Sequence, residues 1–349
     1  MPRGELSMNL ATRLIKTLLV PACAFAASMP AIADDISDFY RNKLVTLVIG
    51  TGPGGAYDIH GRLIGRHIFS HIPGQPKSVI QNIPGAGSIQ AGNFIYSVAP
   101  QDGTVLGNIL NTVPLVQILG QASSQFDAAK FQWIGNMTQE ISIVVAWQTS
   151  GIKTIEDAQK GEVLMGATSP GTLGGMFPKI INQIAGTKFR VITGYKEAVA
   201  IDLAMERGEV QGRAGETWFG AKGTYGEWHR NGKINLLAQV GAKKAADLPT
   251  VPLLTDLAHD DNGRKLAELF TSPSIIGKPT VVGPQVPKER VAALRKAYAE
   301  TMTDPAFLDD AEKIGLAPNP IGGADLEAAV KRIFETPQNL VDLARAAVE

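Results

Sequence analysis

The sequence predicts an α/β fold built on mostly parallel sheets. Runs of β-branched residues alternate with helical patterns along most of the chain. A strand, a glycine-rich loop and a helix start follow one another three times, near residues 50–58, 82–90 and 166–176. Loops of this kind at the carboxyl ends of parallel strands converge on one crevice, so we expect a binding site there.

The first 33 residues resemble a secretory signal peptide. Arg13 and Lys16 supply its positive region, residues 18–27 its apolar core, and Ala31-Ile32-Ala33 a cleavage site before Asp34. We therefore expect export, with cleavage after Ala33. The alternative is an N-terminal amphipathic helix of the folded domain.

Composition after cleavage favours a periplasmic protein. Cys23, the single cysteine, lies inside the signal segment, so the mature chain has no disulfide. Removing residues 1–33 leaves 30 basic residues (33 − 3) and 32 acidic ones (33 − 1), and this balance gives no support for a nucleic-acid or membrane-surface partner. The remaining 316 residues (349 − 33) indicate two domains.

The predicted strands are short, rich in Val, Ile and Leu, and bounded by turn residues. They cover residues 44–49, 78–81, 104–110, 141–147, 162–167, 189–193, 210–214 and 234–240.

The predicted helices repeat apolar residues every three or four positions. They cover residues 57–71, 89–99, 154–160, 176–185, 196–208, 287–302 and 325–334, and Pro100 ends the second. The residues expected to face inward are Ile59, Leu63, Ile64 and Ile68 in the first helix, and Val199, Leu203 and Ala204 in that at 196–208.

The first glycine loop allows two interpretations. Gly50, Gly52 and Gly55 match the G-x-G-x-x-G dinucleotide fingerprint, but residues 70–76 lack the acidic side chain that holds the ribose. Pro53 also removes an amide donor from the turn. We favour a site in which amides at the helix start bind a small anion, with no cofactor.

At this point the chain resembles the Bug family, the periplasmic receptors of tripartite tricarboxylate transporters. The resemblance covers nearly the whole mature chain and rests on these segments: PGGAYD at 53–58, NIPGAGS at 82–88, APQDGTVL at 99–106, the small-residue loop at 166–172, the element at 195–210 and LPTVPLLTDL at 248–257. Four features depart from the family pattern: the Gly50-Thr51-Gly52 lead-in, the inserted Gln101, Ser88 in place of a glycine, and Pro170 with Leu173 in the third loop.

The resemblance implies a type II periplasmic-binding fold, with two α/β lobes, a hinge and a central ligand cleft. The implied limits are 34–142 with 245–349 for lobe 1 and 143–244 for lobe 2. In the family, backbone amides of the first two loops hold a carboxylate of the ligand, while the second lobe contacts the rest of it.

The candidate ligand-binding residues lie in or beside these loops, or on the second lobe. They are Gly54, Gly55, Tyr57, Asp58, Pro84, Gly85, Ala86, Gly87, Ser88, Thr168, Ser169, Thr172, Arg213 and Glu216.

Several of these residues have a second interpretation. Asp58 is an ordinary helix-start residue, or it braces its loop or accepts a hydrogen bond from a ligand or water. Arg213 either pairs with a second ligand carboxylate or forms a structural salt bridge. The hydroxyls of the third loop are either ligand contacts or helix caps. An aromatic slot or ordinary core packing would account for Trp147, Phe177, Trp218 and Phe219.

Catalytic and metal sites are not indicated. His67 and His71 have the i, i+4 spacing of zinc ligands, but no glutamate completes a metalloprotease helix, so these and His60 are interpreted as surface residues. There is no G-x-S-x-G nucleophile elbow.

The favoured function is that of a monomeric periplasmic receptor. It would bind a di- or tricarboxylate or an aromatic carboxylate and deliver it to a membrane permease of the tripartite tricarboxylate type. The alternatives are an exported enzyme acting on a carboxylated metabolite and a sensory co-receptor.

Overall fold

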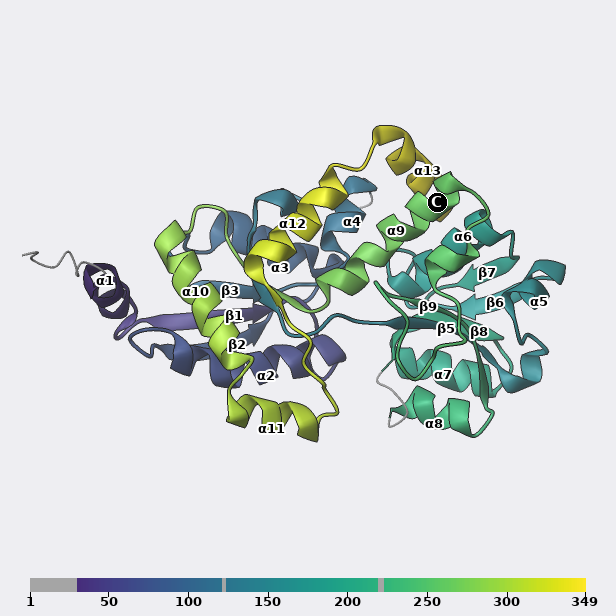
Figure 1. Cartoon of the computed structure of the whole chain (residues 1–349), viewed down its shortest axis with the longest axis horizontal. Helices are drawn as coiled ribbons and strands as arrows, with labels where there is room; N and C mark the ends of the chain where they lie inside the picture. The colour runs from purple at the N-terminus through teal and green to yellow at the C-terminus, as the bar shows by residue number, and fades with distance from the viewer. Residues whose placement is uncertain (1–29, 121–123, 219–222) are drawn as a thin grey trace, which may run out of the picture.

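Two α/β lobes lie side by side in the computed structural model, which describes residues 30–120, 124–218 and 223–349 (Figure 1). The first lobe holds a six-stranded sheet of order β11-β4-β10-β3-β1-β2, and the second a five-stranded sheet of order β7-β6-β8-β5-β9. The two-lobed α/β architecture expected from the sequence is confirmed.

The first sheet combines parallel and antiparallel strands. β1 is parallel to β2 and β3, whereas β10 is antiparallel to β3 and β4, and β11 to β4. The strands are β1 (Leu44–Ile49), β2 (Lys77–Asn82), β3 (Val105–Asn108), β4 (Gln132–Asn136), β10 (Pro279–Val282) and β11 (Ile321–Gly322).

The second sheet is mixed in the same way. β6 is parallel to β7 and β8, and β5 is antiparallel to β8 and β9. The strands are β5 (Ser142–Trp147), β6 (Val163–Gly166), β7 (Phe189–Ile192), β8 (Gly212–Thr217) and β9 (Ile234–Val240). The expectation of mostly parallel sheets is therefore wrong. Strands β4 and β5 lie on either side of the segment 137–141, which crosses between the lobes. Each therefore joins its sheet without a helical crossover, the connection that parallel neighbouring strands require.

Helices cover both sheets. They are α1 (Pro30–Tyr40), α2 (Ala56–His71), α3 (Ile89–Asn93) continued by a π-turn over 94–98, α4 (Val113–Ile118), α5 (Ile155–Lys160), α6 (Leu173–Ala185), α7 (Ala198–Glu206), α8 (Thr224–Arg230), α9 (Asp261–Ile276), α10 (Lys288–Thr301), α11 (Pro305–Lys313), α12 (Gly323–Phe334) and α13 (Gln338–Val348). In the first lobe α2 packs on α10 and α11.

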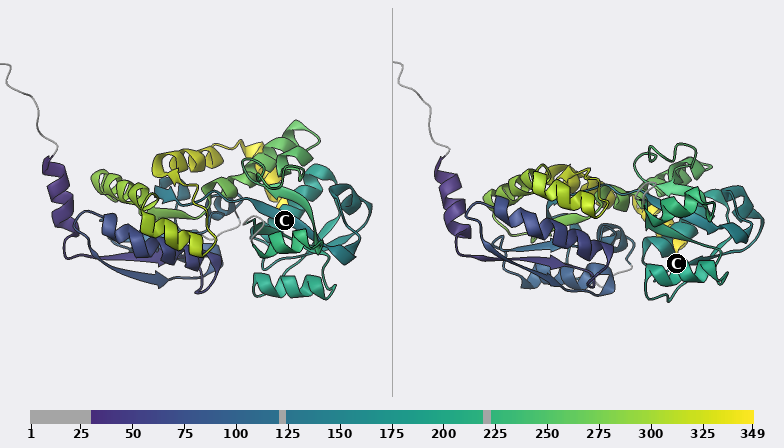
Figure 2. Two further views of the ribbon diagram at one scale, coloured as in Figure 1. Left: turned by 60° about the horizontal axis from the view of Figure 1, so that its bottom comes forward. Right: turned by 90° about the horizontal axis from the view of Figure 1, so that it is seen from below.

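Helices α9 and α13 join the two lobes. α9 packs on α4 and α12 in the first lobe and on α6 in the second, and α13 packs on α6 and α9. The C-terminus therefore lies against the second lobe, while α1 lies at the far end of the first (Figure 2). Because α9 and α13 contact elements of both lobes, the limits at 142/143 and 244/245 remain a prediction.

The buried faces of two helices differ from expectation. Leu63, Ile64 and Ile68 are buried as predicted, but Ile59 is 44% exposed. In α7 the prediction is wrong for Val199 and Leu203, which are exposed, and Ala204 is buried with Ile201 and Met205 instead. Apolar periodicity on so short a helix fits more than one face, and packing against β6 decides between them.

The predicted signal peptide falls almost wholly on residues 1–29, outside the described residues, as does Cys23. The backbone of residues 30–33 belongs to α1, which continues through the predicted cleavage point to Tyr40. Within the described ranges, none of the helices is long and apolar enough to cross a membrane.

Candidate functional site

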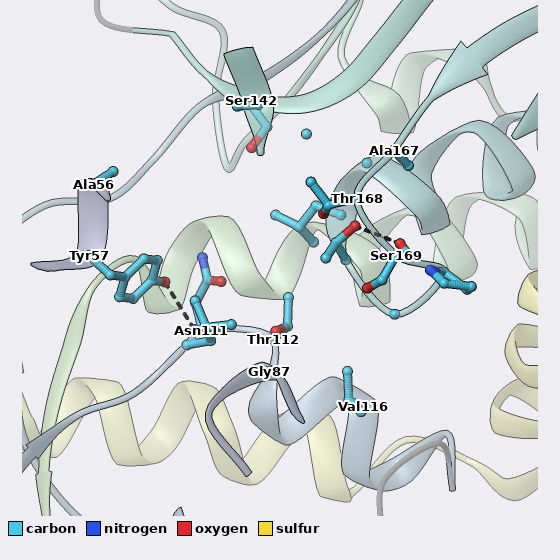
Figure 3. Close-up of a pocket in the computed structure, with 18 of the residues that line it drawn as sticks. Ala56, Tyr57, Gly87, Asn111, Thr112, Val116, Ser142, Ala167, Thr168 and Ser169 are labelled. Atoms are coloured by element: carbon cyan, nitrogen blue, oxygen red, sulfur yellow. Dashed lines mark hydrogen bonds between the residues drawn. The ribbon is translucent and has the colours of Figure 1, made fainter. Parts of the chain in front are cut away.

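A cavity of about 870 Å³ opens between the two lobes (Figure 3). Its first-lobe wall includes the start of α2, the loop before α3 and the segment after β3. Its second-lobe wall includes the third glycine loop, the start of α6 and one end of β8. Three loops that the sequence singled out thus contribute to a single cavity.

Asp58 holds the first loop in place. Its buried carboxylate accepts hydrogen bonds from the Gly54 amide (2.9 Å), Asn82 Nδ2 (2.8 Å) and Arg62 Nε (3.0 Å). Burial alone would raise the pKa of Asp58, but the hydrogen bonds from Arg62, Gly54 and Asn82 lower it below the ordinary value. The interpretation of Asp58 as a brace for the loop is confirmed.

The second loop is shaped by four successive residues with positive φ, from Gly85 to Ser88. Ser88 Oγ donates to the Gly50 carbonyl (2.9 Å) and accepts from the Leu110 amide (3.1 Å). This one buried hydroxyl therefore ties together the ends of three strand-to-helix connections. A Cβ placed on Gly87 meets nothing within 4 Å, so Gly87 presents bare backbone to the cavity.

Tyr57 joins the first loop to the region between the lobes. Its hydroxyl donates to the Gly277 carbonyl (3.0 Å) and accepts from the Asn111 amide (3.0 Å; Figure 3). Burial raises the pKa of Tyr57, so the hydroxyl stays protonated. Its ring lies 5.2 Å from Lys278 Nζ, and that ammonium contacts Glu140 in a buried ion pair.

The third loop leads into α6. Thr172 caps this helix by accepting from the Gly175 amide (3.4 Å), and its hydroxyl donates to the Ser169 carbonyl (2.8 Å). Thr168, Ser169 and Thr172 line the cavity, and Figure 3 shows Thr168 on the same side of it as Ser169. The cap interpretation is confirmed for Thr172, whereas ligand contact by these hydroxyls remains a prediction.

Arg213 is buried in the second-lobe wall and held by acidic partners. Nη1 donates to Asp202 Oδ1 (2.7 Å) and the Tyr225 hydroxyl (2.9 Å), and Nη2 pairs with Glu216. Burial raises the pKa of Glu216, and the Arg213 charge opposes that shift. The structural salt bridge is present. Nε has no partner among the described residues.

The predicted site residues divide into two groups of seven. Lining the cavity are Tyr57, Ala86, Gly87, Thr168, Ser169, Thr172 and Arg213. Outside its lining are Gly54, Gly55, Asp58, Pro84, Gly85, Ser88 and Glu216. Residues 50–55 are likewise outside the lining, so the Gly50-Thr51-Gly52 lead-in does not form part of the cavity wall.

Sequence reasoning missed several polar lining residues, namely Gln90, Asn93, Asn111, Thr112, Glu140, Ser142 and Lys278. Asn111 and Thr112 follow the strand predicted at 104–110, so the rule that sites form at the carboxyl ends of strands would have found them. Ser142 begins β5, which is antiparallel to both of its neighbours, so that rule does not apply to it.

The aromatic slot is not formed by the residues proposed for it. Trp147 packs edge-to-face on Trp228, Phe177 is fully buried, and Trp218 Nε1 donates to Asp247 (3.0 Å). None of these three lines the cavity. Phe219 lies outside the described residues.

The histidines of α2 are structural. His67 Nε2 lies 3.1 Å from Asp310 Oδ2, and His71 Nε2 lies 2.8 Å from Asp304 Oδ2, which ties α2 to α11. His60 is buried, so the surface interpretation is wrong for it; its Nδ1 contacts the Ala56 carbonyl oxygen one turn earlier in the helix. Within residues 30–120, 124–218 and 223–349, no cluster of His, Cys, Asp and Glu has the arrangement of a metal site.

Comparisons with known proteins support this picture. No family model matches the chain. A UPF0065 protein encoded in the gbd 5' region of Cupriavidus necator is 26% identical over 299 residues, which cover 84% of each protein. A solved TctC solute-binding protein from Polaromonas aligns with a TM-score of 0.63 at 18% identity, covering 86% of this chain and 98% of its own. The periplasmic binding protein BugD aligns at 0.61 and 17%, covering 88% and 98%.

The chain has the fold of the TctC and Bug solute-binding proteins. The resemblance drawn from the sequence is thereby confirmed. A further protein of this fold, MatC from Rhodopseudomonas palustris, was solved with bound malate; it aligns with a TM-score of 0.60 at 16% identity, covering 88% of this chain and 99% of its own.

Proposed function

We propose that the protein is a periplasmic receptor for a small organic carboxylate, which it delivers to a membrane permease of the tripartite tricarboxylate type. The observation that carries this proposal is the cavity between the two lobes, whose lining includes residues of the glycine loops and several hydroxyl side chains. The carboxylate found in MatC, which has the same fold, adds support.

The first-lobe loops suit a carboxylate. Ala56 and Tyr57 begin α2, and the first amides of a helix have no partner within the helix. These amides and the bare backbone at Gly87 line the same wall. Together with the positive end of the α2 dipole they attract an anion without needing a free cationic side chain.

The second lobe supplies hydroxyls for the rest of the ligand. Thr168 and Ser169 lie in its loop, and Ser142 and Thr217 on neighbouring strands. A ligand that contacts both walls would favour the closed arrangement of the lobes over the open one. The shift in this equilibrium cannot exceed the difference between the ligand's binding free energies for the closed and open states.

Isothermal titration with a panel of carboxylates tests the receptor function. We expect one ligand per chain, recovered unchanged by mass spectrometry. Thr168→Val and Ser142→Ala should each weaken binding about five- to twentyfold, because each removes a hydroxyl hydrogen bond. Thr149→Val, an exposed threonine in the same lobe, is the matched control and should leave affinity unchanged.

The panel also separates the receptor from its main alternative. Turnover of any bound carboxylate would favour the exported enzyme. Export is tested by N-terminal sequencing of the periplasmic protein, which should begin at Asp34. Delivery is tested by co-purification with permease subunits, and a sensor kinase recovered in their place would favour the sensory role.

A further inference from the structure

Two cationic side chains line the cavity in the part of the chain that the structure describes, Arg213 and Lys278, and both are already neutralised. Lys278 is in contact with Glu140, and both side chains are buried. Arg213 is in contact with two carboxylates, Asp202 and Glu216. Two acidic side chains therefore flank the one guanidinium, so its charge is not free for a ligand.

The polar groups beside Lys278 are also occupied. The Tyr57 hydroxyl uses its proton on Gly277 and accepts from the Asn111 amide. Asn111 Nδ2 donates to the Pro273 carbonyl at 2.9 Å. At this end of the cavity a ligand therefore meets the ring of Tyr57 and polar groups that already have hydrogen-bond or ion-pair partners within the protein.

The start of α6 is covered as well. A Cβ on Gly215 would lie 2.6 Å from the Gly174 amide nitrogen, and one on Gly174 would lie 3.1 Å from the Ala214 carbonyl oxygen. The backbone of β8 thus lies against the first turn of this helix, and a carbonyl oxygen there repels an anion. The remaining wall includes the apolar side chains of Ile89, Leu110, Val116, Leu173, Ala198 and Ile201.

We infer that the cavity takes a carboxylate whose body is apolar and whose far end is uncharged, in preference to a di- or tricarboxylate. This inference rests on the proposed function and narrows its ligand class. One carboxylate reaches the amides of the first-lobe loops. A second would lose its hydration against apolar groups and beside an acid-rich cluster, without a free cation to compensate.

Matched pairs of ligands test this inference by titration calorimetry. Hexanoate is compared with adipate, and benzoate with terephthalate, at pH 7. We expect each monocarboxylate to bind at least about tenfold more tightly than its dicarboxylate partner, since an uncompensated buried charge is costly. Dicarboxylates that bind equally well or better would overturn the inference and leave the receptor function intact. If no carboxylate binds, the proposed function fails and this inference with it.

Two variants test the origin of the preference. Glu216→Gln and Asp202→Asn each free part of the Arg213 charge, so the ratio of monocarboxylate to dicarboxylate affinity should fall at least about threefold. Glu206→Gln, an exposed acid on the same helix as Asp202, is the control and should leave the ratio unchanged. A parallel loss of affinity for both ligand classes would assign the cluster a structural role alone and overturn this part of the inference. The wild-type comparison remains decisive even where a variant does not fold.

Discussion

Single side chains fix the loops of the site. Gln101, inserted relative to the family pattern, donates through Nε2 to the Ile95 and Ala99 carbonyls and accepts from the Gln285 amide. The insertion therefore satisfies carbonyls at the end of the π-turn and joins it to the segment after β10. Gln101 is outside the cavity lining.

Asp58 makes stability depend on pH. Its pKa is lowered in the folded protein, so its contribution is fully present above the ordinary value near pH 4 and is lost as pH falls through the lowered value. Asp58→Asn should lower the free energy of unfolding at pH 7 by about 1–3 kcal/mol and flatten its dependence on pH below 4. Urea unfolding at a series of pH values measures both, and an unchanged acid slope would contradict the assignment.

Gly277 is required where two segments cross. Its φ is +63°, and a Cβ would collide with the Thr138 carbonyl oxygen. Gly277→Ala should lower the free energy of unfolding by more than 2 kcal/mol, from backbone strain plus displacement of the crossing segment. Gly315→Ala is the control, because Gly315 has φ +72° but open space around it, and it should cost only about 1 kcal/mol. Thermal or urea unfolding measures both variants. If the two lose the same free energy of unfolding, the structure relieves the collision at Gly277 and the prediction is wrong.

At the level of elements, the site depends on how three connections are tied together. Ser88 stands where the family has glycine, and its φ of +71° explains why glycine suits the position. The hydroxyl offsets that strain by bonding Gly50 and Leu110.

Ser88→Ala should therefore lower the free energy of unfolding by about 1–3 kcal/mol, because two buried backbone groups lose their partner. It should also weaken carboxylate binding, since the Gly87 backbone becomes less well ordered. Denaturation and calorimetry measure the two effects. Ser70→Ala, on an exposed turn of α2, is the control.

Local signals account for which elements were predictable. β9 at 234–240 coincides with its prediction, because a β-branched and leucine run lies between turn residues. Helix α9 was missed because Pro273 and a polar first half obscure its pattern, and its burial comes from contacts with both lobes. α6 begins at Leu173, earlier than expected, since glycines at 174 and 175 disguise a capped helix start.

On the scale of the whole molecule, a buried ion pair marks the crossing between the lobes. Glu140 lies in the segment 137–141 and Lys278 follows α9, and both are nearly inaccessible to solvent. Burial lowers the pKa of Lys278 to about 7.

Lys278→Met should lower the free energy of unfolding by about 3–5 kcal/mol, because it leaves Glu140 buried without a partner. The double variant Lys278→Met with Glu140→Leu should recover most of that loss, since a well-packed apolar pair is often as stable as the ion pair. Chemical denaturation of the single variants and the double variant gives the coupling free energy between Lys278 and Glu140. Additive losses would contradict the pairing.

Contacts between distant parts of the chain also explain why only some of the predicted site residues line the cavity. The sequence identified the loops, because glycines and helix starts have local signatures. It could not show that Arg213 meets Asp202, since that contact depends on where α7 lies relative to β8. Nor could it show that Glu140 and Lys278, 138 positions apart (278 − 140), meet at the crossing.

The proposed recognition of a carboxylate through backbone at Ala56 and Gly87 would have an evolutionary consequence. An amide donor is kept when its own side chain is replaced by any residue except proline, so substitutions at Ala56 would leave the proposed anchor for the carboxylate in place. Replacements on the opposite wall can then change which molecule is preferred, one step at a time, while binding of the acid group is inherited. The ligand specificity of related proteins could then change without an intermediate form that has lost all binding.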